Sequence, residues 1–365
     1  MSTVILNNFF GKTKASDMML SHLSNYPIRT VEEANVEDNN FLYLYYRPED
    51  FYDIISVGTK EFYRQVRDKN INILIYLEGF DLFSIPDIFE KNLEINNIEY
   101  WRMVNFFNSH GIDEDHLYFI TAADGYQQDI ELLKQKKIVW INQVRPVRSK
   151  FFSFNPFLPW GAMQKDIEIK EKKFEKTYAS LSNGRPAKHR YNFTKTLWKE
   201  DLLKDGLVSM CHMENGDREF ESHLPILFDN AHNLWQSNSN ENNIFQKSFL
   251  WVSNETYMDN KLTLFSEKTV RPMIYMNPFV INGDLRTLAY LKKLGFRTFD
   301  EFWDESYDSI ENDEDRQNEI IKIIKHLKTR NLQELYDKMR PILEHNRNVL
   351  MNTKWNDHLN EFLKS

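Results

Sequence analysis

Short runs of β-branched and aromatic residues alternate with helix-like segments along this chain of 365 residues. Strands that run parallel need long crossover connections between them, and a helix is the usual crossover. In the first half, strands are expected at residues 41–46, 71–77, 116–121 and 137–141, with helices at 88–108 and 126–134. This alternation predicts an α/β fold built on parallel sheets.

A segment with two prolines and a glycine, SKFFSFNPFLPWGA at residues 149–162, interrupts the alternation. The sequence therefore predicts an N-terminal αβ domain over residues 1–160 and a C-terminal αβ domain over 161–345. We expect both to be Rossmann-like and to face a cleft, because open parallel sheets bind ligands at the carboxyl ends of their strands. The expected second-half elements are strands at 177–181, 249–252 and 278–281, helices at 191–203, 285–294 and 346–363, a polar loop at 236–243, and a solvated acidic loop and helix start at 304–315.

Composition excludes several classes of protein. The 46 lysines and arginines against 54 acidic residues give a net charge of −8, which argues against a general nucleic-acid coat. Cys211 is the single cysteine, so a disulfide framework and a cysteine-cluster metal site are excluded. No apolar run approaches the ~20 residues of a membrane span, and the first residues, MSTVILNNFFGKTKASD, do not read as a signal peptide. We expect a cytoplasmic protein.

The segment LSNGRPAKHR at residues 181–190 follows an expected strand and precedes an expected helix. Cations and loop amides before a helix N-terminus are typical of an anion site. The alternative is a solvated basic loop, and spacing alone does not separate the two. The cations and turn formers of the segment are Asn183, Gly184, Arg185, Lys188, His189 and Arg190.

A second polar segment begins at Ser266, which is expected to cap a helix whose first turn holds Glu267 and Lys268. A glutamate is favourable at a helix start, whereas Lys268 and Arg271 oppose the helix dipole there. A bound anion would remove that conflict. The alternative is simply a well-capped helix, and Pro272 predicts that it is kinked or starts irregularly.

These residues belong to a longer pattern: EKTVRP at 267–272, NPFV at 277–280, LKKLGFRTF at 291–299 and DESYD at 304–308. The pattern resembles a family of glycosyltransferase-like proteins common in phages and large viruses. The Glu-Lys pair also resembles the donor motif of α-1,3-fucosyltransferases, in which a threonine stands where this chain has Ser266. The run SNET at 253–256 stands where those enzymes carry a Glu-Asn-Ser element.

The resemblance implies a GT-B arrangement, with the donor nucleotide on the second domain, the acceptor mostly on the first, and a terminal helix over 346–365 that returns to the first domain. It implies inversion at the sugar, no metal, and no cofactor besides a nucleotide sugar as co-substrate. In this reading Glu267 accepts hydrogen bonds from ribose hydroxyls, while Lys268 and Arg190 neutralise the diphosphate. The remaining donor-side candidates are Asn183, Arg185, Glu255 and Arg271.

Sugar transfer also needs a general base for the acceptor hydroxyl. Glu78 ends the run INILIYLE and precedes a glycine, so its carboxylate is the first candidate. Asp124, after HLYFITAAD, is the second. The alternative for both is an acidic residue exposed at the end of a strand.

Three functions remain open from the sequence. The first is transfer of a sugar to a glycan or small acceptor, and the second is transfer to hydroxymethylated bases of viral DNA. The third is a binding or structural protein that keeps the fold without catalysis. A DNA acceptor would need a basic groove with stacking surfaces. Its candidate residues are Arg145, Arg148, Lys150, Phe151 and Phe152.

Overall fold

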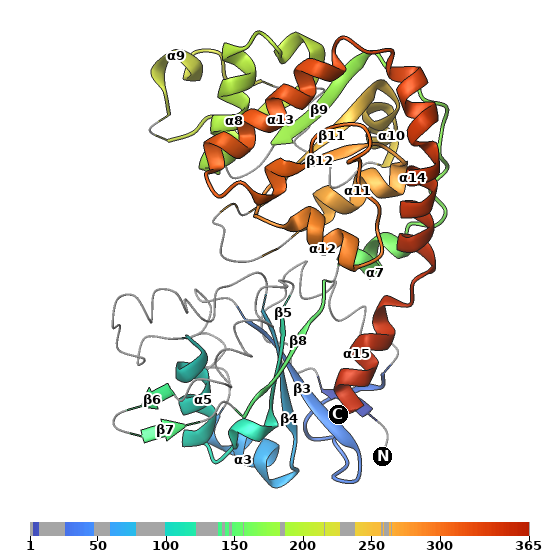
Figure 1. The fold of residues 1–365 in the computed structure, drawn as a ribbon. Helices are drawn as coiled ribbons and strands as arrows, with labels where there is room; N and C mark the ends of the chain where they lie inside the picture. Colours follow the sequence, from blue (N-terminus) through green and yellow to red (C-terminus); the bar gives the residue numbers. More distant parts are fainter. Residues whose placement is uncertain are drawn as a thin grey trace. The chain divides into compact units, whose positions relative to one another are not determined.

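The computed structural model describes residues 3–6, 26–46, 59–77, 99–121, 138–140, 143–145, 148–155, 157–182, 187–214, 216–226, 238–256, 258, 263 and 265–364. The chain divides into two compact units (Figure 1). Unit 1 comprises Met1–Pro156 and Lys354–Ser365, and unit 2 comprises Phe157–Thr353. Among the described residues, no helix is both long and apolar enough to span a bilayer.

Unit 1 contains a parallel sheet in the order β2-β1-β3-β4-β5-β8. Its strands are rich in the β-branched and aromatic residues that suit a pleated, buried surface. The predicted parallel α/β fold is therefore confirmed for this unit. The strands are β1 (Thr3–Leu6), β2 (Ile28–Arg29), β3 (Asn39–Tyr46), β4 (Asn72–Leu77), β5 (Leu117–Thr121) and β8 (Lys150–Ser153), and the helices described beside them are α3 (Lys60–Asp68) and α5 (Glu99–Ser109).

One expectation in unit 1, that each strand joins the parallel sheet, is wrong. β8 lies within residues 149–162, where no strand had been predicted. β6 (Ile138–Trp140) is a strand as predicted, but it pairs antiparallel with β7 (Gln143–Arg145) and lies outside the parallel sheet. The reason is the short connection, since Ile141 and Asn142 alone join the two strands and a parallel crossover needs a dozen residues or more. The predicted helix over 126–134 lies outside the described residues.

The last helix, α15 (Trp355–Lys364), belongs to unit 1 and packs on its sheet. Leu359 and Leu363 are buried among strand residues, and the Phe362 ring stacks on Phe152 at 5.0 Å. A single helix over 346–363 was predicted, and that prediction is wrong. Thr353 is extended, with φ −70° and ψ 134°, and separates α15 from α14 (Leu332–Asn352). The break is needed because the two helices bury their apolar faces in different units.

Unit 2 contains a second parallel sheet, in the order β10-β9-β11-β12. The chain leaves β9 for β10 on one side and later returns to β11 on the other, so the order reverses between β9 and β11. The strands are β9 (Lys176–Ser182), β10 (Gly206–Met210), β11 (Ser248–Asn254) and β12 (Phe279–Asn282). The helices are α7 (Phe157–Ala162), α8 (Lys188–Lys199), α9 (Arg218–Glu221), α10 (Asn238–Lys247), α11 (Glu267–Tyr275), α12 (Thr287–Lys293), α13 (Asp313–Leu327) and α14 (Figure 1).

Three predictions for unit 2 differ from the structure. α10 begins inside the stretch 236–243 that was expected to be a loop. α7 forms where prolines suggested a break, because Gly161 lets it approach α11 and α14; a Cβ there would lie 2.5 Å from Val270. The acidic segment 304–315 is only partly solvated, since the Asp308 carboxylate accepts the amides of Leu288 and Ala289 at the start of α12. Burial raises the pKa of Asp308.

Lys172 connects three segments of unit 2. It is 9% exposed, and its ammonium donates to the carbonyls of Phe245 and Tyr275 at 2.9 and 2.8 Å and to Asn277 Oδ1 at 2.5 Å. Asn277 in turn donates to carbonyls at the end of α10 and the start of β11. One buried amine thus joins α10, the end of α11 and the segment before β9 without a carboxylate, and burial lowers the pKa of Lys172 to about 7.

We predict that Lys172→Met destabilises unit 2 by at least about 2 kcal/mol, because three buried acceptors lose their donor. Urea unfolding at pH 7 measures the change. Lys173→Met is the matched control, since the neighbouring Lys173 side chain is exposed. Equal stability of the two variants would contradict the role given to Lys172.

Candidate functional site

The carboxyl ends of β9 and β11 meet at the point where the strand order of unit 2 reverses. In open parallel sheets, such a reversal leaves a crevice between the connections that follow the two strands, and ligands bind there. The connection after β9 leads to α8, and the residue directly after β11 is Glu255. The position of the site therefore follows from the topology of the sheet.

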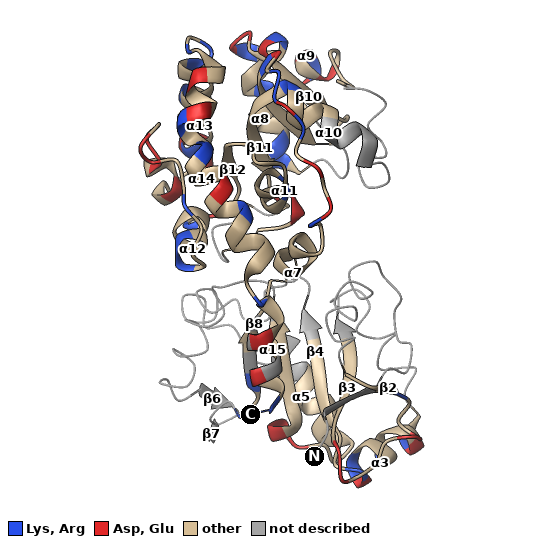
Figure 2. Ribbon diagram, turned by 90° about the vertical axis from the view of Figure 1, so that its right-hand side faces the viewer, with Lys and Arg blue, Asp and Glu red and all other residues tan. Residues whose placement is uncertain are grey.

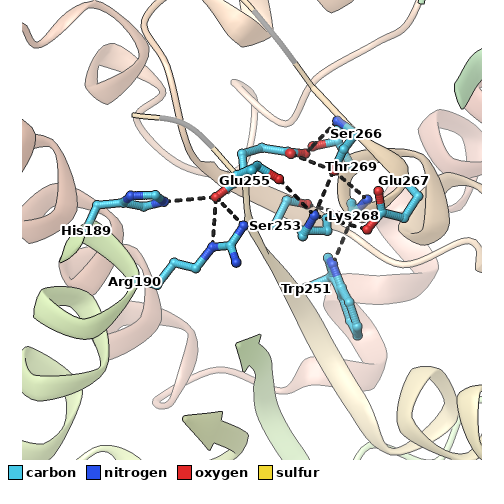
Figure 3. A network of polar contacts seen from close by, with 10 residues as sticks. His189, Arg190, Trp251, Ser253, Glu255, Ser266, Glu267, Lys268 and Thr269 are labelled. Carbon is cyan, nitrogen blue, oxygen red and sulfur yellow. Dashed lines mark hydrogen bonds and ion pairs between the residues drawn. The ribbon is translucent and has the colours of Figure 1, made fainter. Parts of the chain in front are cut away.

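The backbone carbonyl of Glu255 binds the first turn of α8 (Figure 3). It accepts from Arg190 Nε at 2.9 Å, Arg190 Nη2 at 2.8 Å and His189 Nε2 at 2.9 Å. Burial lowers the pKa of His189 to about 4, against the opposing effect of this hydrogen bond. His189 is therefore neutral at pH 7 and carries a proton on Nε2, while Arg190, 9% exposed, supplies a positive charge.

The carboxylate of Glu255 binds the start of α11. Its Oε1 accepts from the backbone N–H of Ser266 at 3.0 Å and from Thr269 Oγ1 at 2.7 Å. Its Oε2 accepts from Ser266 Oγ at 2.7 Å. Glu255 is 2% exposed, so both ends of one buried residue hold the two helices that begin at the site.

The first turn of α11 carries the opposite charges Glu267 and Lys268. Lys268 Nζ donates to Glu267 Oε1 at 3.0 Å, to Ser266 Oγ at 3.0 Å and to Thr256 Oγ1 at 3.3 Å. The Glu267 side chain is 7% exposed and that of Lys268 is 24% exposed. The pair is therefore anchored in the protein on the glutamate side and reachable from solvent on the lysine side.

Pro272 shapes this turn from within the helix. A proline has no N–H, so the carbonyl four residues earlier, that of Lys268, loses its helical partner. β11 replaces it: Trp251 Nε1 and Ser253 Oγ both donate to the Lys268 carbonyl at 3.0 Å. The helix runs from Glu267 to Tyr275 with Pro272 inside it, and its start is fixed to the sheet.

Two opposing effects set the ionisation of Glu267. Burial acts to raise its pKa, but the charge and hydrogen bond of Lys268, together with the charge of Arg271, outweigh burial and the net shift is downward. Arg190 is also close enough for its charge to interact with that of Glu267. A buried carboxylate surrounded by cations remains charged and can accept hydrogen bonds from a ligand.

A buried chain of amides lies behind the site, at the carboxyl edge of the sheet. Asn254 Nδ2 donates to Ser180 Oγ at 2.9 Å, and Asn282 Nδ2 donates to Asn254 Oδ1 at 2.8 Å. Gln317 Nε2, from α13, donates to Asn282 Oδ1 at 2.9 Å and to the carbonyl of His189 at 2.8 Å. The chain ties the first turn of α8 to the ends of β9, β11 and β12.

The structure brings several predicted residues together although they are distant in sequence. Arg190 contacts Glu255, and Glu255 contacts the turn that holds Glu267 and Lys268, with Arg271 one turn further along α11. The predicted cap at Ser266 is confirmed. Four candidates lie outside the described residues: Asn183, Arg185, Glu78 and Asp124.

Two features of the site had not been predicted. The conflict between the α11 dipole and its cations is relieved internally, because the Glu255 carboxylate lies at the start of the helix. Thr269, Asn282 and Gln317 were not candidates, and a signal can be found for Asn282 alone. Asn254 and Asn282 are paired at the ends of neighbouring strands. A polar residue at the end of a buried strand indicates a hydrogen-bond network, because buried polar groups need partners.

The residues suggested for a DNA groove have partners within unit 1. Arg148 pairs with Asp113 and Asp115, and the Lys150 ammonium lies over the Tyr118 ring, 4.5 Å from its centroid. Phe152 is packed under α15. Figure 2 shows both signs of charge along α13 and α15. The side chains of Arg145 and Phe151 lie outside the described ones, and a DNA acceptor stays a prediction.

No protein-family description matches the chain, and no curated protein matches it. Among solved structures, T4 phage β-glucosyltransferase with UDP-glucose is 12% identical, with a TM-score of 0.46 and coverage of 100% of both chains. An α1,3-fucosyltransferase with GDP is 10% identical, with a TM-score of 0.37 and coverage of 97% of this chain and 92% of that one. Values this low assign neither a substrate nor a site residue to this chain.

We predict that Lys268→Met destabilises the protein more at pH 7 than at pH 3.5. The pKa of Glu267 is lowered from 4.5 on folding, so its pairing adds stability above about pH 4.5 and loses it as the pH falls through the lower folded value. Without Lys268, this contribution disappears, at a cost of about 1–3 kcal/mol at pH 7.

Urea unfolding across that pH range measures the difference. Lys325→Met is the control, because Lys325 pairs with Glu200 where both side chains are exposed. A loss of stability in Lys268→Met that is independent of pH would show that the pair does not set the ionisation of Glu267.

Proposed function

We propose that the protein is a glycosyltransferase that binds a nucleotide-sugar donor at the reversal point of the unit 2 sheet. One observation carries this proposal: Arg190 and Lys268 place positive charge beside the buried, ionised Glu267 at the edge where parallel sheets bind ligands. A nucleoside diphosphate combines the two groups that such a site complements, an anion and a pair of hydroxyls.

The cations suit a diphosphate leaving group. When the sugar departs, negative charge builds on the phosphate oxygens, and fixed positive groups stabilise it. The Lys268 side chain is partly exposed, and besides Glu267 and Ser266 it contacts the hydroxyl of Thr256 at 3.3 Å, which a phosphate oxygen can replace. We therefore assign the neutralising role to these side chains.

Glu267 suits the ribose. A carboxylate only accepts hydrogen bonds, and the two hydroxyls of a ribose donate them. Analogues without these hydroxyls would leave Glu267 with the hydrogen bond from Lys268 but without the donors of the ribose. A site discriminates strongly against a ligand that leaves one of its buried polar groups incompletely paired. Arg271 and Glu255 complete the donor side of the proposal, with Asn183 and Arg185 from the connection before α8.

The acceptor is proposed to bind unit 1, with Glu78 as general base and Asp124 as the second candidate. Glu78 follows β4 in the sequence, and β4 pairs with β3, which is next to the reversal point of that sheet between β1 and β3. Asp124 follows β5, one strand further away. The proposed reaction inverts the sugar and transfers it to a hydroxyl of a glycan or small molecule in the cytoplasm.

We predict that UDP or GDP raises the melting temperature, and that binding falls about tenfold or more in Lys268→Ala because a hydrogen bond to a charged group is lost. A ligand at about 100 times its Kd should stabilise by roughly 2.7 kcal/mol.

Glu267→Gln should reduce the preference for a ribonucleoside diphosphate over its 2′,3′-dideoxy analogue, from about tenfold to below about threefold. Calorimetric titration measures the dissociation constants of the wild type, Lys268→Ala and Glu267→Gln.

Lys292→Ala is the control for the loss of a cation, because Lys292 pairs with Asp300 at the surface of the same unit. Absence of any nucleoside diphosphate binding to the wild type would refute the donor site. An unchanged preference in Glu267→Gln would remove the ribose role alone.

A separate prediction concerns the base. Glu78→Gln should leave Kd for the nucleoside diphosphate unchanged and reduce turnover by at least about a hundredfold, since a positioned base contributes about 10²–10⁴ to rate. Release of nucleoside diphosphate from UDP- and GDP-sugars with a panel of acceptors measures turnover. If Glu78→Gln stays active and Asp124→Asn does not, the base is Asp124.

A further inference from the structure

Glu255 is the residue through which the two halves of the site are joined. Its carbonyl holds Arg190 and its carboxylate holds the start of α11, as described above. Its carboxylate oxygens already accept from three donors within the protein, and the residue is 2% exposed. A group so occupied is better suited to hold other residues in place than to contact a ligand.

The Ser266 hydroxyl transmits the position of this carboxylate to Lys268. A hydroxyl has one hydrogen and two lone pairs. The hydrogen of Ser266 Oγ goes to Glu255 Oε2 at 2.7 Å, and its lone pairs accept from Lys268 N at 3.4 Å and Lys268 Nζ at 3.0 Å. Every hydrogen-bonding position of the hydroxyl is therefore used, and its orientation depends on an acceptor at Oε2.

Only a carboxylate satisfies these contacts. If a glutamine amide oxygen took the place of Oε1, its NH₂ group would face Ser266 Oγ, whose lone pairs are already occupied by Lys268. If the amide were turned over, its NH₂ group would face the N–H of Ser266, and two donors would meet. In the first orientation the hydroxyl must turn and the ammonium of Lys268 loses a partner. In the second orientation the start of α11, which carries Lys268, loses the contact from the Ser266 N–H that holds it.

We propose that Glu255 is a positioning residue that fixes the Lys268 ammonium through Ser266 while its own carbonyl fixes Arg190. This inference rests on the donor site proposed above. The two halves can be separated experimentally, because a side-chain substitution at Glu255 keeps the carbonyl that binds Arg190. Glu255→Gln should therefore act on Lys268 and leave Arg190 in place.

Binding of UDP, or of GDP if UDP does not bind, tests the coupling in a double-mutant cycle. Glu255→Gln should weaken binding about five- to tenfold, and the same change made in Lys268→Met should weaken it less than twofold further. When Glu255→Gln is added to Arg190→Met, it should still weaken binding about five- to tenfold. If the losses of affinity caused by Glu255→Gln and Lys268→Met multiply in the double variant, the proposal is wrong.

Matched variants exclude a general loss of structure. Ser266→Ala removes the hydroxyl and should reproduce the effect of Glu255→Gln, whereas Ser266→Thr keeps it and should restore affinity to within about twofold. Glu305→Gln removes another partly buried carboxylate of unit 2, which accepts from the N–H of Phe299. That variant should change the melting temperature without changing Kd.

A measurement without ligand separates this inference from the proposed function. Brief acetylation with acetic anhydride, followed by mass spectrometry, reports how firmly the Lys268 amine is held. Glu255→Gln and Ser266→Ala should be labelled at Lys268 several-fold faster than the wild type, and Glu305→Gln should not. If Lys268 is labelled at the wild-type rate in both variants, the positioning role is overturned even if nucleotides bind. If Glu255→Gln does not fold, an unchanged rate in Ser266→Ala alone has the same meaning. Faster labelling in a protein that binds no nucleoside diphosphate would refute the proposed function and leave the positioning role standing.

Discussion

A buried carboxylate must find donors within the protein, and in unit 2 that requirement falls on Glu255. Burying such a charge is costly unless it is fully hydrogen-bonded. Glu255 meets the condition with the backbone and hydroxyl of Ser266 and the hydroxyl of Thr269, so the start of α11 can occupy only one position relative to β11. The same residue presents its carbonyl to α8, so the two helices that carry the cations are both tied to Glu255.

The parallel sheet provides the edge on which this arrangement is built. β9 and β11 end side by side, and the amides of Asn254, Asn282 and Gln317 continue the hydrogen bonding past the last strand pairs. These amides are stable at this depth because each finds a partner, which makes the edge rigid. A rigid edge with cations above it is well suited to hold a charged ligand without rearranging.

The secondary structure was predictable where the local pattern was strong. β3, β4, β5, β9, β11 and β12 follow from β-branched and aromatic runs, and the Ser266 cap follows from residue type. The failures have physical causes of their own. The QSNSNENN stretch is polar and gives no apolar period, yet α10 starts within it. The predicted helix over 346–363 is interrupted because its two parts pack in different units.

The sequence by itself determined the parallel α/β class, the capped start of α11, and the presence of Glu267 and Lys268 in its first turn. It also determined, through the missing N–H of Pro272, that the Lys268 carbonyl would need partners from elsewhere. Only the tertiary structure decided that Trp251 and Ser253 supply them and that Glu255 faces inward. It alone placed Arg190 beside α11, because contacts between residues so far apart in sequence depend on strand order, which local patterns do not encode.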